Sequence, residues 1–233
     1  YNFIKILMIY LISTLITIFI YSLCNIRLFD SFNLAFTSIS SGGFLPSSDL
    51  SAILNNNTKI FALSLGLLFP IFNFFLIFDI FTKQFKFRDH AEDIHIALLI
   101  IFITLFFYFF IISNDGFSYA LLSITTSVST SGIITSSPNA DLSVFYILLT
   151  IVGGSLISTS SGFKYTRFYI LLKISYQEIY RLVKPINVID KNLFNTETKI
   201  GDQDFRIAFL VFIALIISIF ILSSILIFDT LSF

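Results

Sequence analysis

Five long apolar stretches divide this chain, and each has about the length needed to cross a membrane as a helix. They are Phe3–Leu23, Ile60–Phe81, Ile94–Ile112, Val144–Ile174 and Phe205–Phe228. The hydrocarbon core of a bilayer is about 30 Å thick, and a helix needs about 20 apolar residues to span it. The pattern therefore predicts an all-α integral membrane protein. A composition that is 56% hydrophobic and only 12% charged agrees with this prediction.

The fourth stretch is too long for one simple span, and its middle is not apolar. Residues 153–164 read GGSLISTSSGFK. Glycine and serine at this density weaken a helix. Irregular backbone at membrane depth is tolerated only inside protein or beside water. We therefore predict a broken helix that lines a cavity.

Lysine and arginine predict the orientation of the spans. Basic residues gather in the connections 83–93 and 175–204, and Lys5 begins the first span. The number of predicted spans between these three places puts all of them on the same side of the membrane, which is predicted to be cytoplasmic. The opposite side carries only Arg27 and Lys59.

A polar segment between spans occurs twice. Residues 37–48 and 126–137 are offset by 89 positions, and six of the twelve aligned residues are identical. Before each copy lies a segment, Leu28–Phe36 or Phe117–Thr126, that is too short to cross, because nine helical residues reach only about 13 Å. Each unit is thus predicted to contain a span, a re-entrant helix, a polar loop and a second span.

The repeated loops predict binding of a dehydrated cation by backbone and hydroxyl oxygens. The oxygen-rich residues are Ser40, Ser41, Gly42, Gly43, Ser129, Thr130, Ser131 and Gly132. The C-terminal end of each re-entrant helix would point at its loop, and its partial negative charge favours a cation there. A plain outer turn between helices is the alternative, and the second copy favours ion binding over it.

The repeat also predicts the organisation of the chain. Two pore units, 1–82 and 94–174, are joined by the cytoplasmic loop 83–93; a second cytoplasmic loop, 175–204, precedes the first span of a further unit, 205–233. Residues 227–233 echo residues 28–32, so we expect a further re-entrant helix to begin there and the chain to be a fragment.

Several polar residues allow more than one interpretation. Asp30 or Ser31 can cap the first re-entrant helix, and Asp30 and Asp141 could equally attract cations to the outer mouth. Asp79 is expected at the membrane interface. The acidic and histidine residues between 89 and 95 predict a solvated charged turn rather than a metal site.

In their order along the chain, the motifs resemble those of TrkH-type pore subunits of bacterial potassium uptake systems, within the Trk/Ktr/HKT superfamily. Gly42-Gly43-Phe44 and Val128–Gly132 resemble two of that family's filter segments. Residues 153–164, followed by Arg181–Pro185, resemble its broken span and the stretch after it, and Asn73 matches an asparagine of an earlier span.

The resemblance implies a four-unit potassium pore, of which this chain would hold units two and three and the start of unit four. Potassium would be the transported ion, bound at the filter residues, with no covalent cofactor. Gly43 and Gly132 hold the two visible filter-glycine positions, which favours potassium over sodium. A gate beneath the filter would comprise Gly153, Gly154, Ser158, Thr159, Ser160, Ser161, Gly162 and Lys164.

The implied partners are a second copy of the protein and a cytoplasmic nucleotide-binding regulatory ring (TrkA-like), in the bacterial inner membrane. Zero net charge argues against nucleic acid as a partner. The sequence departs from the family at Ile133, where an aromatic residue is usual, and in the gate loop, which has fewer glycines.

Two other functions fit parts of the sequence. A secondary transporter could use the broken helix at its midplane. An intramembrane serine hydrolase could use residues 160–162, but no histidine follows His95 to act as a base, which leaves Lys164 as the nearby substitute. Lys164 could also simply extend to the cytoplasmic edge.

Overall fold

The computed structural model describes residues 2–47, 50–82, 86–110, 116–133, 142–183, 192–195 and 199–230. Within these ranges the regular elements are helices, apart from one isolated bridge. The chain divides into two compact units, Tyr1–Tyr165 and Thr166–Phe233. The prediction of an all-α fold is confirmed, while the finer boundaries of pore units and loops stay predictions.

By length and apolar composition, three of the described helices could cross a membrane. They include Ile4–Leu23, Ala91–Phe110 and Asp202–Ile227. Each coincides with one of the predicted spans. The other two predicted spans are interrupted, as described below.

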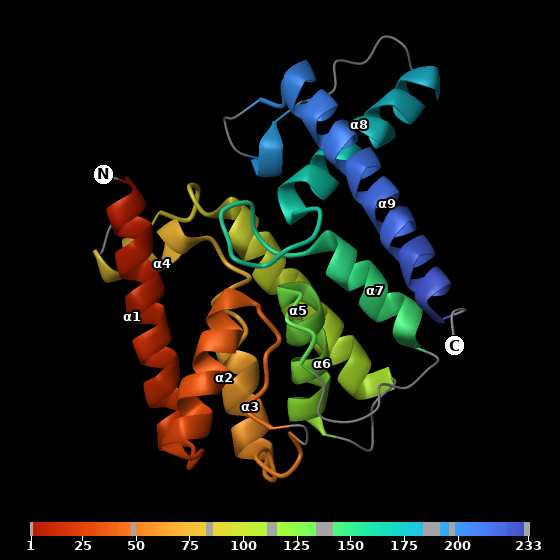
Figure 1. Ribbon diagram of the computed structural model, residues 1–233. Helices are drawn as coiled ribbons and strands as arrows, with labels where there is room; N and C mark the ends of the chain where they lie inside the picture. Colours follow the sequence, from red (N-terminus) through yellow and green to blue (C-terminus); the bar gives the residue numbers. More distant parts are fainter. Residues whose placement is uncertain are drawn as a thin grey trace. The chain divides into compact units, whose positions relative to one another are not determined.

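The first repeat contains four helices (Figure 1): α1 (Asn2–Leu23), α2 (Leu28–Ser40), α3 (Asn57–Gly66) and α4 (Phe74–Phe81). α2 starts close to the end of α1 and runs back alongside it, so the short helix predicted after the first span is present.

Tyr21 holds three helices of the first repeat together. Its ring is fully buried, and its hydroxyl lies 2.9 Å from Ser38 Oγ in α2 and 3.5 Å from the Leu63 carbonyl in α3. The apolar surface around it, with Leu34 and Leu67, forms the core of this repeat.

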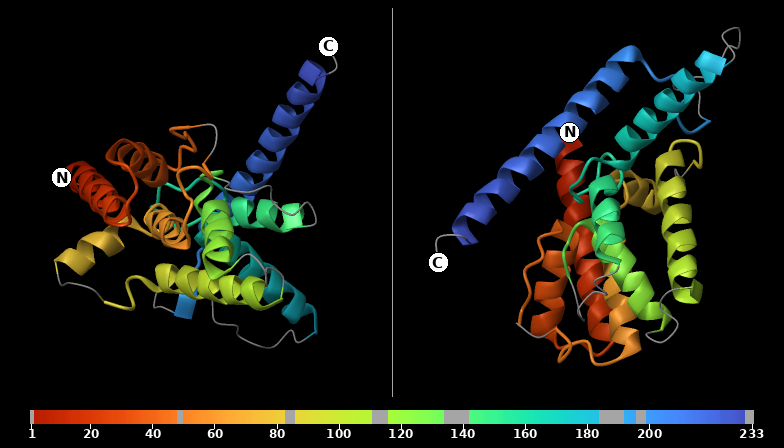
Figure 2. Two further views of the ribbon diagram at one scale, coloured as in Figure 1. Left: turned by 90° about the horizontal axis from the view of Figure 1, so that it is seen from below. Right: turned by 90° about the vertical axis from the view of Figure 1, so that its right-hand side faces the viewer.

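The second repeat contains α5 (Ala91–Phe110), α6 (Phe117–Ser129) and α7 (Ser143–Val152). α6 packs against α5, α7 and α3, so α3 and α6 lie side by side where the repeats meet (Figure 2). α2 and α6 each have 13 residues, and both their first and last residues are 89 apart. The sequence repeat is therefore also a structural repeat.

The span predicted at Ile60–Phe81 is wrong as a continuous helix. α3 ends at Gly66, and a turn leads to α4, whose N-cap Asn73 accepts a hydrogen bond from Phe75 N at 3.0 Å. Pro70 within the turn has no N–H to donate to a helix. The helix break predicted at 153–164 is confirmed, because α7 ends at Val152 and α8 begins at Tyr165.

Capping of α2 by Asp30 or Ser31 is also wrong. The helix begins at Leu28, so both residues lie inside its first turn, and the N-cap Arg27 makes no side-chain cap. Ser31 Oγ donates instead to the Ile26 carbonyl at 3.2 Å.

The second compact unit comprises α8 (Tyr165–Val183) from Thr166 onward, a short 3-10 helix η2 (Leu193–Asn195) and α9 (Asp202–Thr230). Tyr169 of α8 stacks on Phe194 with ring centroids 4.4 Å apart, and Lys173 Nζ donates to the Asn192 carbonyl. α9 continues through Asp229 and Thr230, so the expected re-entrant helix does not begin there. Residues 231–233 lie outside the described residues.

Candidate ion filter and gate

The two re-entrant helices end in the same way. Ser41 after α2 and Thr130 after α6 both have left-handed backbone, with φ of 52° and 59°. After α2, Ser41 N donates to the Ser38 carbonyl, and Gly42 N donates to the Thr37 carbonyl. The equivalent bonds follow α6, so each chain turns sharply out of its helix at the predicted filter loop.

The two filter loops touch each other. Gly43 and Gly132 have positive φ, 72° and 68°, which glycine adopts without strain. A Cβ atom on Gly43 would lie 2.5 Å from the Ser131 carbonyl oxygen, whereas one on Gly132 would meet nothing within 4 Å. The structure thus brings the eight predicted filter residues to one place, where the ends of α2 and α6 converge.

Side-chain hydroxyl groups of α6 and of the loop itself hold the second filter loop in place. Thr126 Oγ1 lies 2.9 Å from Ser131 Oγ and accepts a hydrogen bond from Ile133 N at 2.9 Å. Ser129 Oγ donates to Ser131 Oγ at 3.1 Å. Ile133, where an aromatic residue is usual in the family, is fully buried.

The loop 153–164, called here the gate segment, hydrogen-bonds to the ends of both re-entrant helices. Thr159 Oγ1 donates to the Ile39 carbonyl of α2 at 2.7 Å. Ser161 donates to Thr130 Oγ1 through its amide at 2.9 Å and through its hydroxyl at 2.7 Å. Thr159 and Ser161 of this serine- and threonine-rich loop therefore attach it to the C-terminal ends of α2 and α6.

Lys164 is bonded within the gate segment. Its Nζ donates to the Ser158 carbonyl and hydroxyl, each at 3.1 Å, and to the Ser160 carbonyl at 2.5 Å. Its backbone is left-handed, with φ of 79°. The ammonium group therefore folds back onto the loop.

The gate segment also docks on the break between α3 and α4. Ser155 N donates to the Ile71 carbonyl at 2.8 Å, and Phe74 N donates to the Ile157 carbonyl at 3.1 Å. The approach is so close that a Cβ atom on Gly154 would lie 2.6 Å from Ile71 O. The two helix breaks thus satisfy each other's backbone groups, as buried or membrane-embedded backbone requires.

The prediction of a solvated charged turn at residues 89–95 agrees with the exposure of Asp89 but is wrong for His90 and Asp93. His90 and Asp93 are only 4% and 2% exposed. His90 Nε2 lies 2.9 Å from Asp79 Oδ2 of α4, and Asp93 Oδ1 accepts a hydrogen bond from Asn73 N at 2.8 Å. The described residues contain no cluster of three metal-ligating side chains. The sequence pattern of charges gave no sign that these groups are buried.

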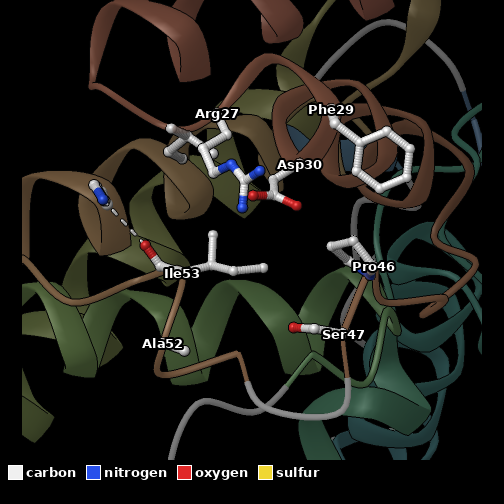
Figure 3. A pocket seen from close by; sticks show the side chains of 9 residues that line it. Arg27, Phe29, Asp30, Pro46, Ser47, Ala52 and Ile53 are labelled. Carbon is white, nitrogen blue, oxygen red and sulfur yellow. Dashed lines mark hydrogen bonds between the residues drawn. The ribbon is translucent and has the colours of Figure 1, made fainter.

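A pocket of about 600 Å³ opens where α2 begins (Figure 3). Both basic residues of the predicted outer side, Arg27 and Lys59, lie beside it. Lys59 Nζ donates to the Ile53 carbonyl at 3.2 Å, and Arg27 points toward Asp30. The neighbouring guanidinium opposes attraction of cations by Asp30, and Asp141, the other candidate, lies outside the described residues.

Comparisons with known proteins fit this architecture. No family model matches the chain. An uncharacterised cation transporter of Methanocaldococcus jannaschii is 26% identical over 222 residues, covering 93% of this chain and 45% of that protein. The Trk system potassium uptake protein TrkG of Escherichia coli is 29% identical over 187 residues, covering 74% of this chain and 38% of that protein.

The structural comparison gives the same fold. The crystal structure of the potassium transporter TrkH from Vibrio parahaemolyticus superimposes with a TM-score of 0.74 and 22% identity, over 88% of this chain and 46% of that chain. The present chain thus spans less than half the length of each of these three proteins.

The apolar helices and the similar proteins indicate a multi-pass membrane protein, and the similar proteins named above are transporters. Together, the two sequence relatives and the shared fold confirm the predicted resemblance to TrkH-type proteins of the Trk/Ktr superfamily.

Proposed function

We propose that this chain forms part of a pore for potassium ions. Residues 40–43 and 129–132 supply part of its selectivity filter, and the gate segment closes the path beneath them. The observation that carries the proposal is the contact between the two repeated loops, Gly43 against the Ser131 carbonyl, at the converging ends of α2 and α6.

Simple electrostatics support a cation at this place. The last carbonyls of a helix lack intrahelical partners, and the helix end carries about half a negative charge. Two such ends meet here, beside carbonyl and hydroxyl oxygens that can replace the hydration shell of an alkali ion. Two loops are too few to surround an ion, so we propose that further units of the same polypeptide complete the ring.

The gate role is supported by the contacts of the gate segment. It lies against Ile39 and Thr130, the residues from which both filter loops emerge. A segment held there by hydroxyl groups and backbone bonds can leave without breaking a packed helix. We further propose a second copy, a nucleotide-binding regulatory ring on the cytoplasmic side and a bacterial inner-membrane location, as the resemblance implies.

The alternative functions receive less support. Ser161 donates its hydroxyl to Thr130, and the Lys164 ammonium binds carbonyl oxygens. Neither arrangement is that of a nucleophile beside a base. The similar proteins named above are transporters, which leaves a secondary transporter as the second candidate.

The proposal is tested by ion flux into liposomes that contain the full-length protein, with its regulatory partner and nucleotide supplied. We expect uptake of K⁺ and Rb⁺ well above that of Na⁺. Absence of any alkali-ion flux would contradict the pore, and saturable uptake of an organic solute would favour the secondary transporter.

Two matched substitutions test the filter assignment. Gly132→Ala introduces only backbone strain, about 1–2 kcal/mol, whereas Gly43→Ala adds a collision with the Ser131 carbonyl. We therefore expect Gly43→Ala to lower both the melting temperature and the K⁺ flux further than Gly132→Ala, and both variants to weaken the preference for K⁺. Phe102→Leu, on an exposed face of α5, is the control. If both glycine variants kept the wild-type preference for K⁺, the assignment of these loops to the filter would be wrong.

A further inference from the structure

The first turn of α5 holds one end of the gate segment through a carboxylate. Glu92 Oε1 accepts a hydrogen bond from Leu156 N at 3.0 Å, and Glu92 Oε2 accepts one from Ser155 Oγ at 3.2 Å. Both carboxylate oxygens therefore bind the loop. Glu92 precedes Ser155 by 63 residues, so this contact is purely tertiary.

The next residue holds the other helix break. Asp93 is 2% exposed, and its Oδ1 accepts the hydrogen bond from Asn73 N at 2.8 Å. His90 connects the same turn to α4, because its Nε2 lies 2.9 Å from Asp79 Oδ2. Consecutive acidic residues at a helix N-terminus, where the helix dipole favours negative charge, thus fix both irregular segments at once.

The bonds at the two sides of the gate segment differ in strength. Glu92 makes charge-assisted hydrogen bonds, which are roughly twice as strong as neutral ones. Thr159 and Ser161 attach the filter side through neutral hydroxyl and amide groups. Separation of the segment from α2 and α6 therefore breaks only neutral bonds to those helices, and the charge-assisted bonds to Glu92 can stay in place.

We infer that Glu92 is a positioning residue for the gate. It holds residues 155–156 in place, so that opening is a swing of residues 158–161 away from α2 and α6 about that fixed end, with loss of the bond from Ser160 N to the Pro70 carbonyl. This inference rests on the proposed function, since it specifies how the gate of that pore moves.

The test combines hydrogen exchange with ion flux in the full-length protein. In Glu92→Ala we expect exchange in a peptide containing residues 154–157 to rise about tenfold or more, since bonds to a charged group are lost. Glu92→Gln retains one oxygen acceptor and should show a smaller rise. Asp89→Asn removes an exposed carboxylate three residues away and is the matched control, with no change expected.

The flux measurement separates gating from general damage. Without the fixed end, residues 158–161 are no longer held in position against α2 and α6, so their bonds to Ile39 and Thr130 weaken in the closed state. Glu92→Ala should therefore raise basal Rb⁺ flux severalfold while the ratio of K⁺ to Na⁺ flux stays as in wild type. Three results would each overturn the inference: unchanged exchange at 154–157, unchanged Rb⁺ flux, or a loss of both Rb⁺ flux and the preference for K⁺ over Na⁺. A wild-type protein that conducts no ions would instead overturn the proposed pore, while the exchange data would still report whether Glu92 fixes the loop.

Discussion

Thr37 and Thr126 occupy equivalent positions in the two re-entrant helices, yet their surroundings differ. Thr126 is bonded to Ser131 Oγ and Ile133 N, whereas the buried Thr37 Oγ1 has no hydrogen-bond partner among the described residues. One substitution between the repeats accounts for the missing side-chain bond, because the position of Ser131 is Gly42 in the first loop. The second filter loop is therefore held by more side-chain bonds than the first.

A pair of threonine substitutions tests this difference. Thr126→Val leaves the buried Ile133 amide without an acceptor, which costs about 1–3 kcal/mol. Thr37→Val removes a hydroxyl that makes no bond and should be nearly neutral or slightly stabilising. Thermal unfolding in detergent should therefore show a lower melting temperature for Thr126→Val than for Thr37→Val. Equal melting temperatures would argue against the bonds around Ser131.

At the scale of elements, both repeats break their second span at the same place. With the offset of 89 residues, the turn 67–73 corresponds to residues 156–162 of the gate segment. Among the described residues, only the second break hydrogen-bonds to the ends of α2 and α6, through the hydroxyl groups of Thr159 and Ser161. The first break supplies backbone groups, such as the Ile71 carbonyl and the Phe74 amide, that hydrogen-bond to the second break.

Removing the filter-side bonds should favour the open state. Thr159→Val and Ser161→Ala each delete one neutral hydrogen bond, which contributes about 0.5–1.5 kcal/mol. We expect each to raise basal Rb⁺ flux about two- to tenfold, with ion preference retained. Thr150→Val is the control, because Thr150 Oγ1 bonds only within α7, to the Tyr146 carbonyl. Flux that falls or stays constant in both variants would contradict a gate held closed by these bonds.

The elements differ in how well the sequence predicts them. The re-entrant helices and the gate break follow from local patterns, namely short apolar segments and dense glycine and serine. The apolar pattern predicts a continuous span across 67–73 and hides the break there, although Gly66, Pro70 and Asn73 are local signals for it. Its stabilising partners, Ser155 and Ile157, lie more than 80 residues away, where no local pattern reveals them.

The polar contacts of the site were harder still to predict. The filter residues could be named from the repeat, but the role of Glu92 could not. A charged turn looks the same in sequence whether it is solvated or buried against a loop that folds over it. Only the packing of α4, α5 and the gate segment distinguishes these cases.

For the whole molecule, the orientation in the membrane remains a prediction from the basic residues. Cys24 is the one cysteine of the chain, so a Cys24→Ser background allows labelling of single introduced cysteines. In intact cells, a membrane-impermeant maleimide should label Asn55→Cys, whereas Asp89→Cys should react only after permeabilisation; both positions are exposed. Phe102→Cys, on a span, should resist labelling in either case. The reverse labelling pattern would show that the predicted orientation in the membrane is wrong.

The mutual docking of the two helix breaks has a consequence for biogenesis. A ribosome makes residues 67–73 long before residues 154–160, so the first break enters the bilayer before its partner exists. Until then, backbone groups such as the Ile71 carbonyl and the Phe74 amide lack their final acceptors and donors, at a cost of several kcal/mol for each unsatisfied group in lipid. The nascent first repeat must therefore stay helical, hydrated or shielded by the insertion machinery, and it reaches its final shape only when the second repeat arrives.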